Sequence, residues 1–188
     1  MVLSERRKMF KKFLSNKAYP IIFLTIIVAI SVILLVVVNN ITSPVVEARR
    51  MEEITGNLEK IFPGIDKYEL KDEIYFIYGK DGEKLGYAFT ASGSGYGGVI
   101  DILVGLNSNF EIEGVSIISQ TETPGVGARI TESSFTDQFK GLTINDIALK
   151  SGGGKIDAIT GATISSNAVV SAIRDRMSEV LDTLESSK

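Results

Sequence analysis

The sequence predicts an α+β protein with a single N-terminal transmembrane helix followed by one extracytoplasmic domain, in which a twisted antiparallel sheet packs against a long C-terminal helix. Three observations predict this fold: an uncharged apolar run near the start, several strand-like runs with short connections, and an amphipathic segment at the end. We divide the 188 residues into a basic N-terminus (1–18), a transmembrane helix (19–39), a linker with an amphipathic helix (40–65) and a domain (66–188).

The apolar run from Tyr19 to Val38 contains 20 residues and no charge. As a helix with a rise of about 1.5 Å per residue it spans about 30 Å, the thickness of a bilayer's hydrocarbon core. A cleaved signal peptide is the alternative, but its apolar core is only about 7–15 residues long, and no A-x-A-like site follows here. Six Lys and Arg against one Glu precede the run, so we expect a single-pass protein of the cell (inner) membrane with residues 1–18 in the cytoplasm.

Periodicity and turn residues predict the remaining elements. Residues 41–44 are interpreted as a short linker, and 45–62 as an amphipathic helix interrupted near Gly56 and ended by Pro63 and Gly64. Antiparallel strands are expected between 66 and 119, at 74–78, 85–92, 97–106 and 110–119, with a bulge at Gly114. A short helix capped by Thr131 (131–141), a strand (156–159) and a final helix (166–185) complete the prediction.

Composition excludes several kinds of site. The chain contains no Cys and no His, which excludes disulfides, iron–sulfur clusters, Cys-ligated zinc, His-ligated haem and Ser–His or Cys–His nucleophilic pairs within it. We predict no metal site and no catalytic residue. Residues 19–188 carry 14 Lys and Arg against 22 Asp and Glu, a net charge of −8, which argues against nucleic acid as a partner.

Three segments contain more glycines and hydroxyls than their turns require. The first is "ASGSGYGG" (91–98), whose Tyr96 offers a flat ring, and the second is "TETPGVGAR" (121–129), whose Pro124 and Gly125 suit a type II turn. Each of these two could equally be an ordinary loop. The third, "DAITGATISS" (157–166), leads into the final helix, whose N-terminus favours anions. Ser165 or Ser166 would cap that helix, and hydroxyls of Thr163, Ser165 and Ser166 would surround a phosphate.

These segments resemble three motifs of the FMN-binding domain family. "DAITGAT" (157–163) is similar to the family's D-x-x-[ST]-G-A-T motif, "ETPGVG" (122–127) to its E-T-P-G-[LV]-G loop, and "GYGG" (95–98) to a third element. The motif resemblance covers about residues 95–188. It implies that a flavin transferase moves the FMN phosphate from FAD onto the Thr163 hydroxyl, so that each chain carries one covalent FMN in its 66–188 domain.

The resemblance also implies which residues surround the cofactor. Beside Thr163, those expected to contact it are Tyr96, Glu122, Thr123, Gly125, Val126, Gly127, Thr160, Gly161, Ala162 and Ser165. The flavin transferase would recognise Asp157, Thr160, Gly161, Ala162 and Thr163.

The anchored single-domain form is similar to the G subunits of Rnf-type ion-translocating ferredoxin:NAD oxidoreductases. That similarity implies an electron-transfer subunit, non-autonomous as an enzyme, with other membrane subunits as partners. Two flavoprotein alternatives remain: a stand-alone anchored FMN carrier, and the C subunit of a sodium-pumping NADH:quinone reductase. A third alternative is an anchored scaffold domain in which the three glycine-rich segments are only turns.

Overall fold

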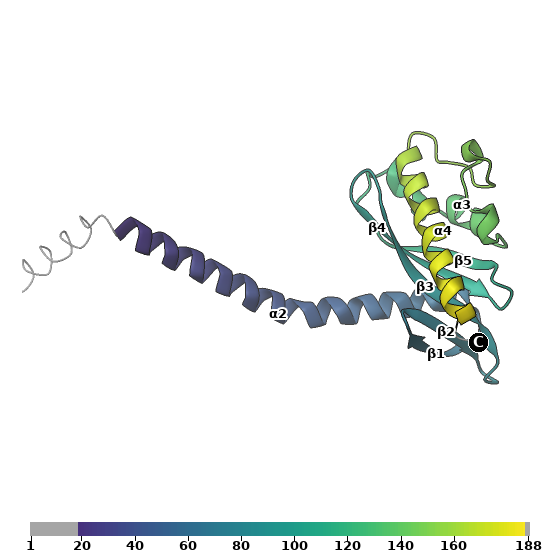
Figure 1. The fold of residues 1–188 in the computed structure, drawn as a ribbon, viewed down its shortest axis with the longest axis horizontal. Coiled ribbons are helices and arrows are strands. Elements are labelled where there is room, and N and C mark those ends of the chain that lie inside the picture. Colours follow the sequence, from purple (N-terminus) through teal and green to yellow (C-terminus); the bar gives the residue numbers. More distant parts are fainter. Residues whose placement is uncertain (1–18, 187–188) are drawn as a thin grey trace, which may run out of the picture. The chain divides into compact units, whose positions relative to one another are not determined.

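The computed structural model describes residues 19–186 (Figure 1). Its contacts divide the chain into two compact units, with the boundary between Arg50 and Met51. The basic segment 1–18, for which we expect a cytoplasmic position, lies outside the described residues.

Helix α2 (Tyr19–Ile61) contains the apolar run. Its stretch Pro20–Thr42 has a mean hydropathy of 3.5 and is the one candidate membrane span among the described residues. The predicted linker at 41–44 and the interruption near Gly56 are wrong, because α2 continues through both. A glycine costs a helix about 1 kcal/mol and an interior proline about 3 kcal/mol, so both residues weaken α2 locally without ending it.

Five strands form a single antiparallel sheet in the second unit. They are β1 (Ile65–Lys71), β2 (Ile74–Gly79), β3 (Lys84–Ser94), β4 (Val99–Asn107) and β5 (Ile112–Ser119). The spatial order follows the chain, so each strand pairs with its predecessor through a short connection, as the sequence predicts for β2 to β5. The first strand, β1, was not among the strands predicted from the sequence. The register between β4 and β5 shifts between Gly105 and Leu106, opposite Gly114, where the bulge was expected.

Both faces of the sheet are covered. One face packs under helix α4 (Thr163–Ser186), which lies across the strands in Figure 1. The predicted apolar stripe of α4 is confirmed in the buried residues Val169, Val170, Ile173, Met177, Val180 and Leu184. The other face packs against the end of α2, through Ile54, Leu58 and Ile61, and against Phe62, which follows the helix.

Glycines allow the end of α2 to approach the sheet closely. Gly105 and Gly114 are paired across β4 and β5, and both lie under Ile61. A Cβ atom on Gly105 would collide with Ile61 and come within 2.8 Å of the Phe62 ring. Side chains at this pair would therefore hold the helix away from the sheet.

The segment between β5 and α4 contains only short turns of helix. These are η1 (Gly127–Thr131), α3 (Ser133–Thr136), η2 (Asp137–Phe139), η3 (Ile144–Asp146) and η4 (Lys150–Gly152). The predicted cap by Thr131 is wrong, because its hydroxyl donates to the Ala128 carbonyl at 2.9 Å and α3 is preceded by Glu132. The predicted strand at 156–159 is also wrong, since Ile156 makes only an isolated bridge to Leu149.

Replacing Leu58 with Ala should lower the free energy of unfolding by about 2–5 kcal/mol, because the side chain is fully buried between α2 and the sheet. Thermal unfolding of the full chain in detergent measures the effect. Leu70→Ala is the matched control, since Leu70 is 55% exposed on β1. Equal losses in the two variants would show that the end of α2 does not stabilise the sheet.

Candidate functional site

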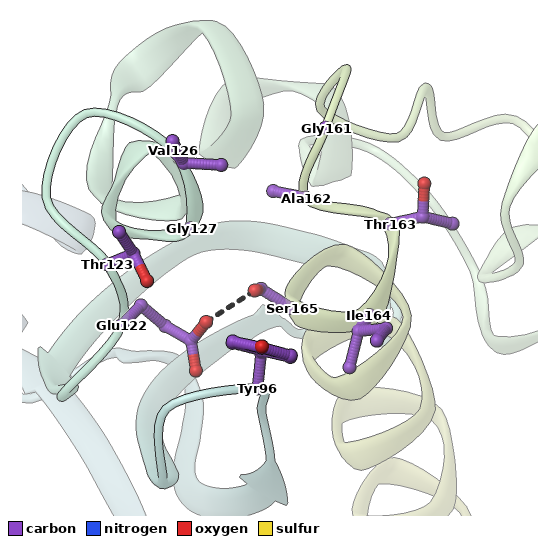
Figure 2. A pocket seen from close by; sticks show the side chains of 10 residues that line it. All are labelled: Tyr96, Glu122, Thr123, Val126, Gly127, Gly161, Ala162, Thr163, Ile164 and Ser165. Carbon is purple, nitrogen blue, oxygen red and sulfur yellow. Dashed lines mark hydrogen bonds between the residues drawn. The ribbon is translucent and has the colours of Figure 1, made fainter.

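The three glycine-rich segments meet at one pocket of about 350 Å³ (Figure 2). The first is the loop from β3 to β4, the second joins β5 to η1, and the third leads into α4. The lining residues are Tyr96, Glu122, Thr123, Val126, Gly127, Gly161, Ala162, Thr163, Ile164 and Ser165.

Two turns of the same form border the pocket. In residues 123–126 the N–H of the fourth residue donates to the carbonyl of the first at 3.2 Å, and residues 159–162 repeat this bond at 2.9 Å. The third residue of each turn is a glycine with positive φ, 75° at Gly125 and 81° at Gly161. This geometry matches the type II turn predicted for the first of these turns. Gly125 itself lies outside the pocket lining, so its contribution is to the shape of the turn.

The Glu122 carboxylate is buried where the three segments meet, with only 4% of the residue exposed. Its Oε1 accepts the Gly97 N–H at 2.9 Å, and its Oε2 accepts the Ser165 hydroxyl at 2.5 Å (Figure 2). One carboxylate therefore links the β3–β4 loop and the first turn of α4 to its own segment. Hydrogen bonds to a charged acceptor are stronger than neutral ones, which suits a group taken out of water.

The surroundings of Glu122 require small residues. A Cβ atom on Gly95 would collide with Oε1, and one on Gly127 would lie 2.5 Å from Oε2 and 3.0 Å from the Ser165 hydroxyl. The glycines of these motifs therefore make room for the buried carboxylate. A second hydrogen bond fixes the β3–β4 loop, because the Thr121 hydroxyl donates to the Gly97 carbonyl at 3.2 Å.

Helix α4 begins at Thr163, three residues earlier than predicted. The expectation that Ser165 or Ser166 caps the helix is therefore wrong, because both lie inside its first turn. The Ser166 hydroxyl donates to the Ala162 carbonyl at 2.9 Å and accepts the Ile159 N–H at 3.0 Å, while Ser165 turns toward Glu122. Both serine hydroxyls are buried and engaged with protein partners, so in this structure neither is free to contact a phosphate as expected.

Thr163 lies at the rim of the pocket and is exposed. Figure 2 shows its hydroxyl pointing away from Glu122 and Ser165. Exposed apolar groups line the same opening: Tyr96 is 74% exposed, Val126 42% and Ile164 58%. Ile164 was not among the residues predicted from sequence, although an apolar residue directly after the motif, at a helix start, was the available signal.

Asp157 and Thr160 do not line the pocket. Both are exposed, and the Asp157 carboxylate accepts a hydrogen bond from Lys150 Nζ at 2.6 Å. The Asp157 N–H donates to the Gln138 side chain at 2.8 Å, which fixes the start of the segment on the outer surface of the domain. The structure thus separates these two motif positions from the pocket itself.

The turns that precede this segment are fixed by another carboxylate. Asp146 accepts hydrogen bonds from Lys155 and from the backbone and hydroxyl of Thr143, and these bonds lower the pKa of its carboxyl group, with Lys155 contributing most. The contacts join the two ends of the 143–155 segment just before the motif begins.

Replacing Ser165 with Ala should lower the free energy of unfolding by about 1–3 kcal/mol, because Glu122 Oε2 would lose its donor in a buried position. Thermal unfolding of the cofactor-free full chain measures the change. Ser178→Ala is the control, an exposed serine of the same helix that should stay within about 0.5 kcal/mol of the wild type. A Ser165 variant as stable as this control would contradict the linking role of Glu122.

Comparisons with known proteins give a family for this domain. The family model for the FMN-binding domain matches residues 95–178, which include all three segments. The C subunit of a Na⁺-translocating NADH-quinone reductase from Parabacteroides distasonis is a structural neighbour, 28% identical with a TM-score of 0.47, over 54% of this chain and 57% of that one.

Curated relatives extend the similarity beyond the domain. The G subunit of a proton-translocating ferredoxin:NAD⁺ oxidoreductase complex from Clostridium ljungdahlii is 32% identical over 84% of this chain and 88% of its own length. A Na⁺-translocating counterpart from Acetobacterium woodii is 36% identical over 68% of this chain and 62% of its own. The chain belongs to the family of G subunits of ion-translocating ferredoxin:NAD⁺ oxidoreductase (Rnf) complexes, membrane complexes in which it supplies an FMN-binding domain.

Proposed function

We propose that this chain carries FMN through a phosphoester to Thr163 and relays single electrons between redox subunits of its complex. The observation that supports this most directly is the position of Thr163, whose exposed hydroxyl lies at the rim of a pocket built from all three glycine-rich segments. A modifying enzyme can reach that hydroxyl, while the pocket beside it can house the ring.

The pocket fits a flat heterocycle. Its size is within the range of small-molecule sites, about 300–1,000 Å³. Apolar side chains of Tyr96, Val126 and Ile164 offer surfaces for a ring system, and the backbone at Gly127 and Gly161 allows close approach. Glu122, Thr123 and Ala162 would border the ring directly. Ser165 would act through Glu122, whose carboxylate it orients.

Attachment is a group transfer from FAD, catalysed by a flavin transferase. A bond forms between Thr163 Oγ and the phosphorus of the FMN half, the pyrophosphate P–O bond breaks, AMP leaves, and the hydroxyl proton is released. The exposed Asp157 and Thr160, with Gly161 and Ala162, would serve the recognition step, which agrees with the position of the first two outside the pocket.

The start of α4 suits the phosphodiester that results. The first intrahelical bond is donated by Ser166 to Ala162, which leaves the N–H groups of residues 163–165 for other acceptors. The helix dipole adds a partial positive charge there, which favours the single negative charge of a diester.

Bound FMN would supply the electron chemistry, and the chain would hold it in place. The partners would be the other membrane subunits of the Rnf-type complex, together with the flavin transferase for maturation. Covalent attachment prevents loss of the cofactor on the extracytoplasmic side, where a lost FMN could not readily be replaced.

Co-expression of the full chain with a flavin transferase should give in-gel flavin fluorescence and a mass increase of one FMN less one water. Thr163→Ala should lose both signals completely, because the accepting hydroxyl is gone, and Thr163→Ser should keep them. Thr131→Ala is the control, an exposed threonine outside the motif. A Thr163→Ala chain that still carries covalent flavin would place the attachment site elsewhere.

We also infer that the N-terminus lies in the cytoplasm and the FMN domain outside it, from the basic residues before the span. A reporter enzyme that is active only outside the cytoplasm, fused after Lys188, should therefore be active. The same reporter fused before Met1 is the control and should be inactive. The reverse result would invert the proposed topology.

A further inference from the structure

The pocket contains an acidic residue and no basic one. Among the described residues, none of those that line it is Lys or Arg, and Glu122 is the one carboxylate. Sites that hold a free phosphate group in proteins usually combine backbone N–H groups with Arg or Lys side chains. The basic side chain of that arrangement is missing from the lining of this pocket.

Basic side chains near the three segments already contact carboxylates. Lys150 contacts Asp157 at 2.6 Å, and Lys155 contacts Asp146 at 2.9 Å. Arg129, which follows the second segment, lies 3.4 Å from Glu132. In this structure these three cations contact carboxylates outside the pocket, and none of them is part of its lining.

The positive feature that remains is the start of α4 at Thr163. A helix N-terminus is equivalent to about half an elementary charge and stabilises a nearby anion by about 0.3–1 kcal/mol. A free phosphate monoester carries about −1.5 to −2 at pH 7, whereas a phosphodiester carries one negative charge. The half charge offsets a larger share of the single negative charge of a diester than of the charge of a free phosphate, and the Glu122 carboxylate in the same pocket repels the more highly charged free phosphate more strongly.

We propose that the pocket recognises the flavin ring and not the phosphate, so that the unmodified chain binds riboflavin at least as tightly as free FMN. The covalent bond to Thr163 then supplies the retention that a cationic phosphate site would otherwise give. A short tether raises the effective concentration of the ring to about the millimolar range, which keeps a weakly binding pocket occupied. This inference rests on the proposed function, since it assumes that the pocket houses a flavin.

The test is a pair of titrations on the full chain, purified in detergent from a host without the transferase. Quenching of flavin fluorescence gives a Kd for riboflavin and one for FMN, at low and at high salt. The Kd for FMN should equal that for riboflavin or be up to about tenfold larger, and added salt should shrink the difference because it screens the repulsion. FMN bound tenfold more tightly than riboflavin would overturn the proposal, and so would the absence of binding by either flavin.

A designed gain of affinity gives a second test. Ile164 is 58% exposed at the rim and follows Thr163 directly, so Ile164→Lys should be tolerated and adds a flexible cation within the same turn as the attachment residue. Ile164→Gln is the matched control, because it loses the same apolar contact without adding charge. The Lys variant should bind FMN several-fold more tightly relative to riboflavin than the Gln variant does, and an identical ratio in the two would contradict the inference.

The mass measurement with the transferase separates the two proposals. A chain that gains covalent FMN at Thr163, yet prefers free FMN over riboflavin by tenfold, keeps the proposed function and overturns this inference. A chain that never gains covalent FMN, yet binds both flavins as expected, overturns the attachment and keeps the ring-selective pocket.

Discussion

The buried Glu122 carboxylate is the interaction on which the site depends. It accepts one hydrogen bond from the Gly97 N–H and one from the Ser165 hydroxyl, so three segments far apart in the sequence share one acceptor. Taking a carboxylate out of water costs several kcal/mol unless its oxygens find donors. The donors here come from the other two segments, so the carboxylate is satisfied only when all three are in place. Glycines at 95 and 127 are required for the same reason, because a side chain there would occupy the space of the carboxylate.

The fold gives these segments a fixed frame. The pairing of β3 with β4 sets the position of the loop between them, in a sheet that is covered on both faces. Helix α4 is held on that sheet by its stripe of buried apolar residues. Because the stripe fixes the position of α4, it also fixes where the helix begins, and Thr163 is its first residue. Packing at a distance from the pocket therefore sets the place of the exposed hydroxyl at its rim.

Under the proposed function, the flavin ring and its phosphate would make opposite demands on this site. The ring would need an apolar pocket, and Tyr96, Val126 and Ile164 offer apolar surface there beside glycine backbone. The phosphate, if held without a covalent bond, would need a cation, which the lining does not contain. A phosphoester at Thr163 removes that demand, because it lowers the charge of the phosphate and keeps the ring near the pocket. Under this proposal, the covalent bond retains the phosphate end of the cofactor and the pocket binds its ring.

The sequence by itself determined the apolar helix, the antiparallel order of the strands, the stripe of the final helix and the three motifs, because each depends on local periodicity or local turn chemistry. Tertiary structure decided what the serines of "DAITGATISS" do. Sequence spacing predicted a cap, but α4 begins at Thr163, so Ser165 and Ser166 lie within its first turn and are buried. Their hydrogen-bond partners are Glu122, Ile159 and Ala162. Glu122 lies 43 positions before Ser165, so the local spacing of residues cannot reveal that contact. The covering of the second sheet face by the end of α2 was hidden for the same reason, since only the folded chain brings Ile61 onto Gly105 and Gly114.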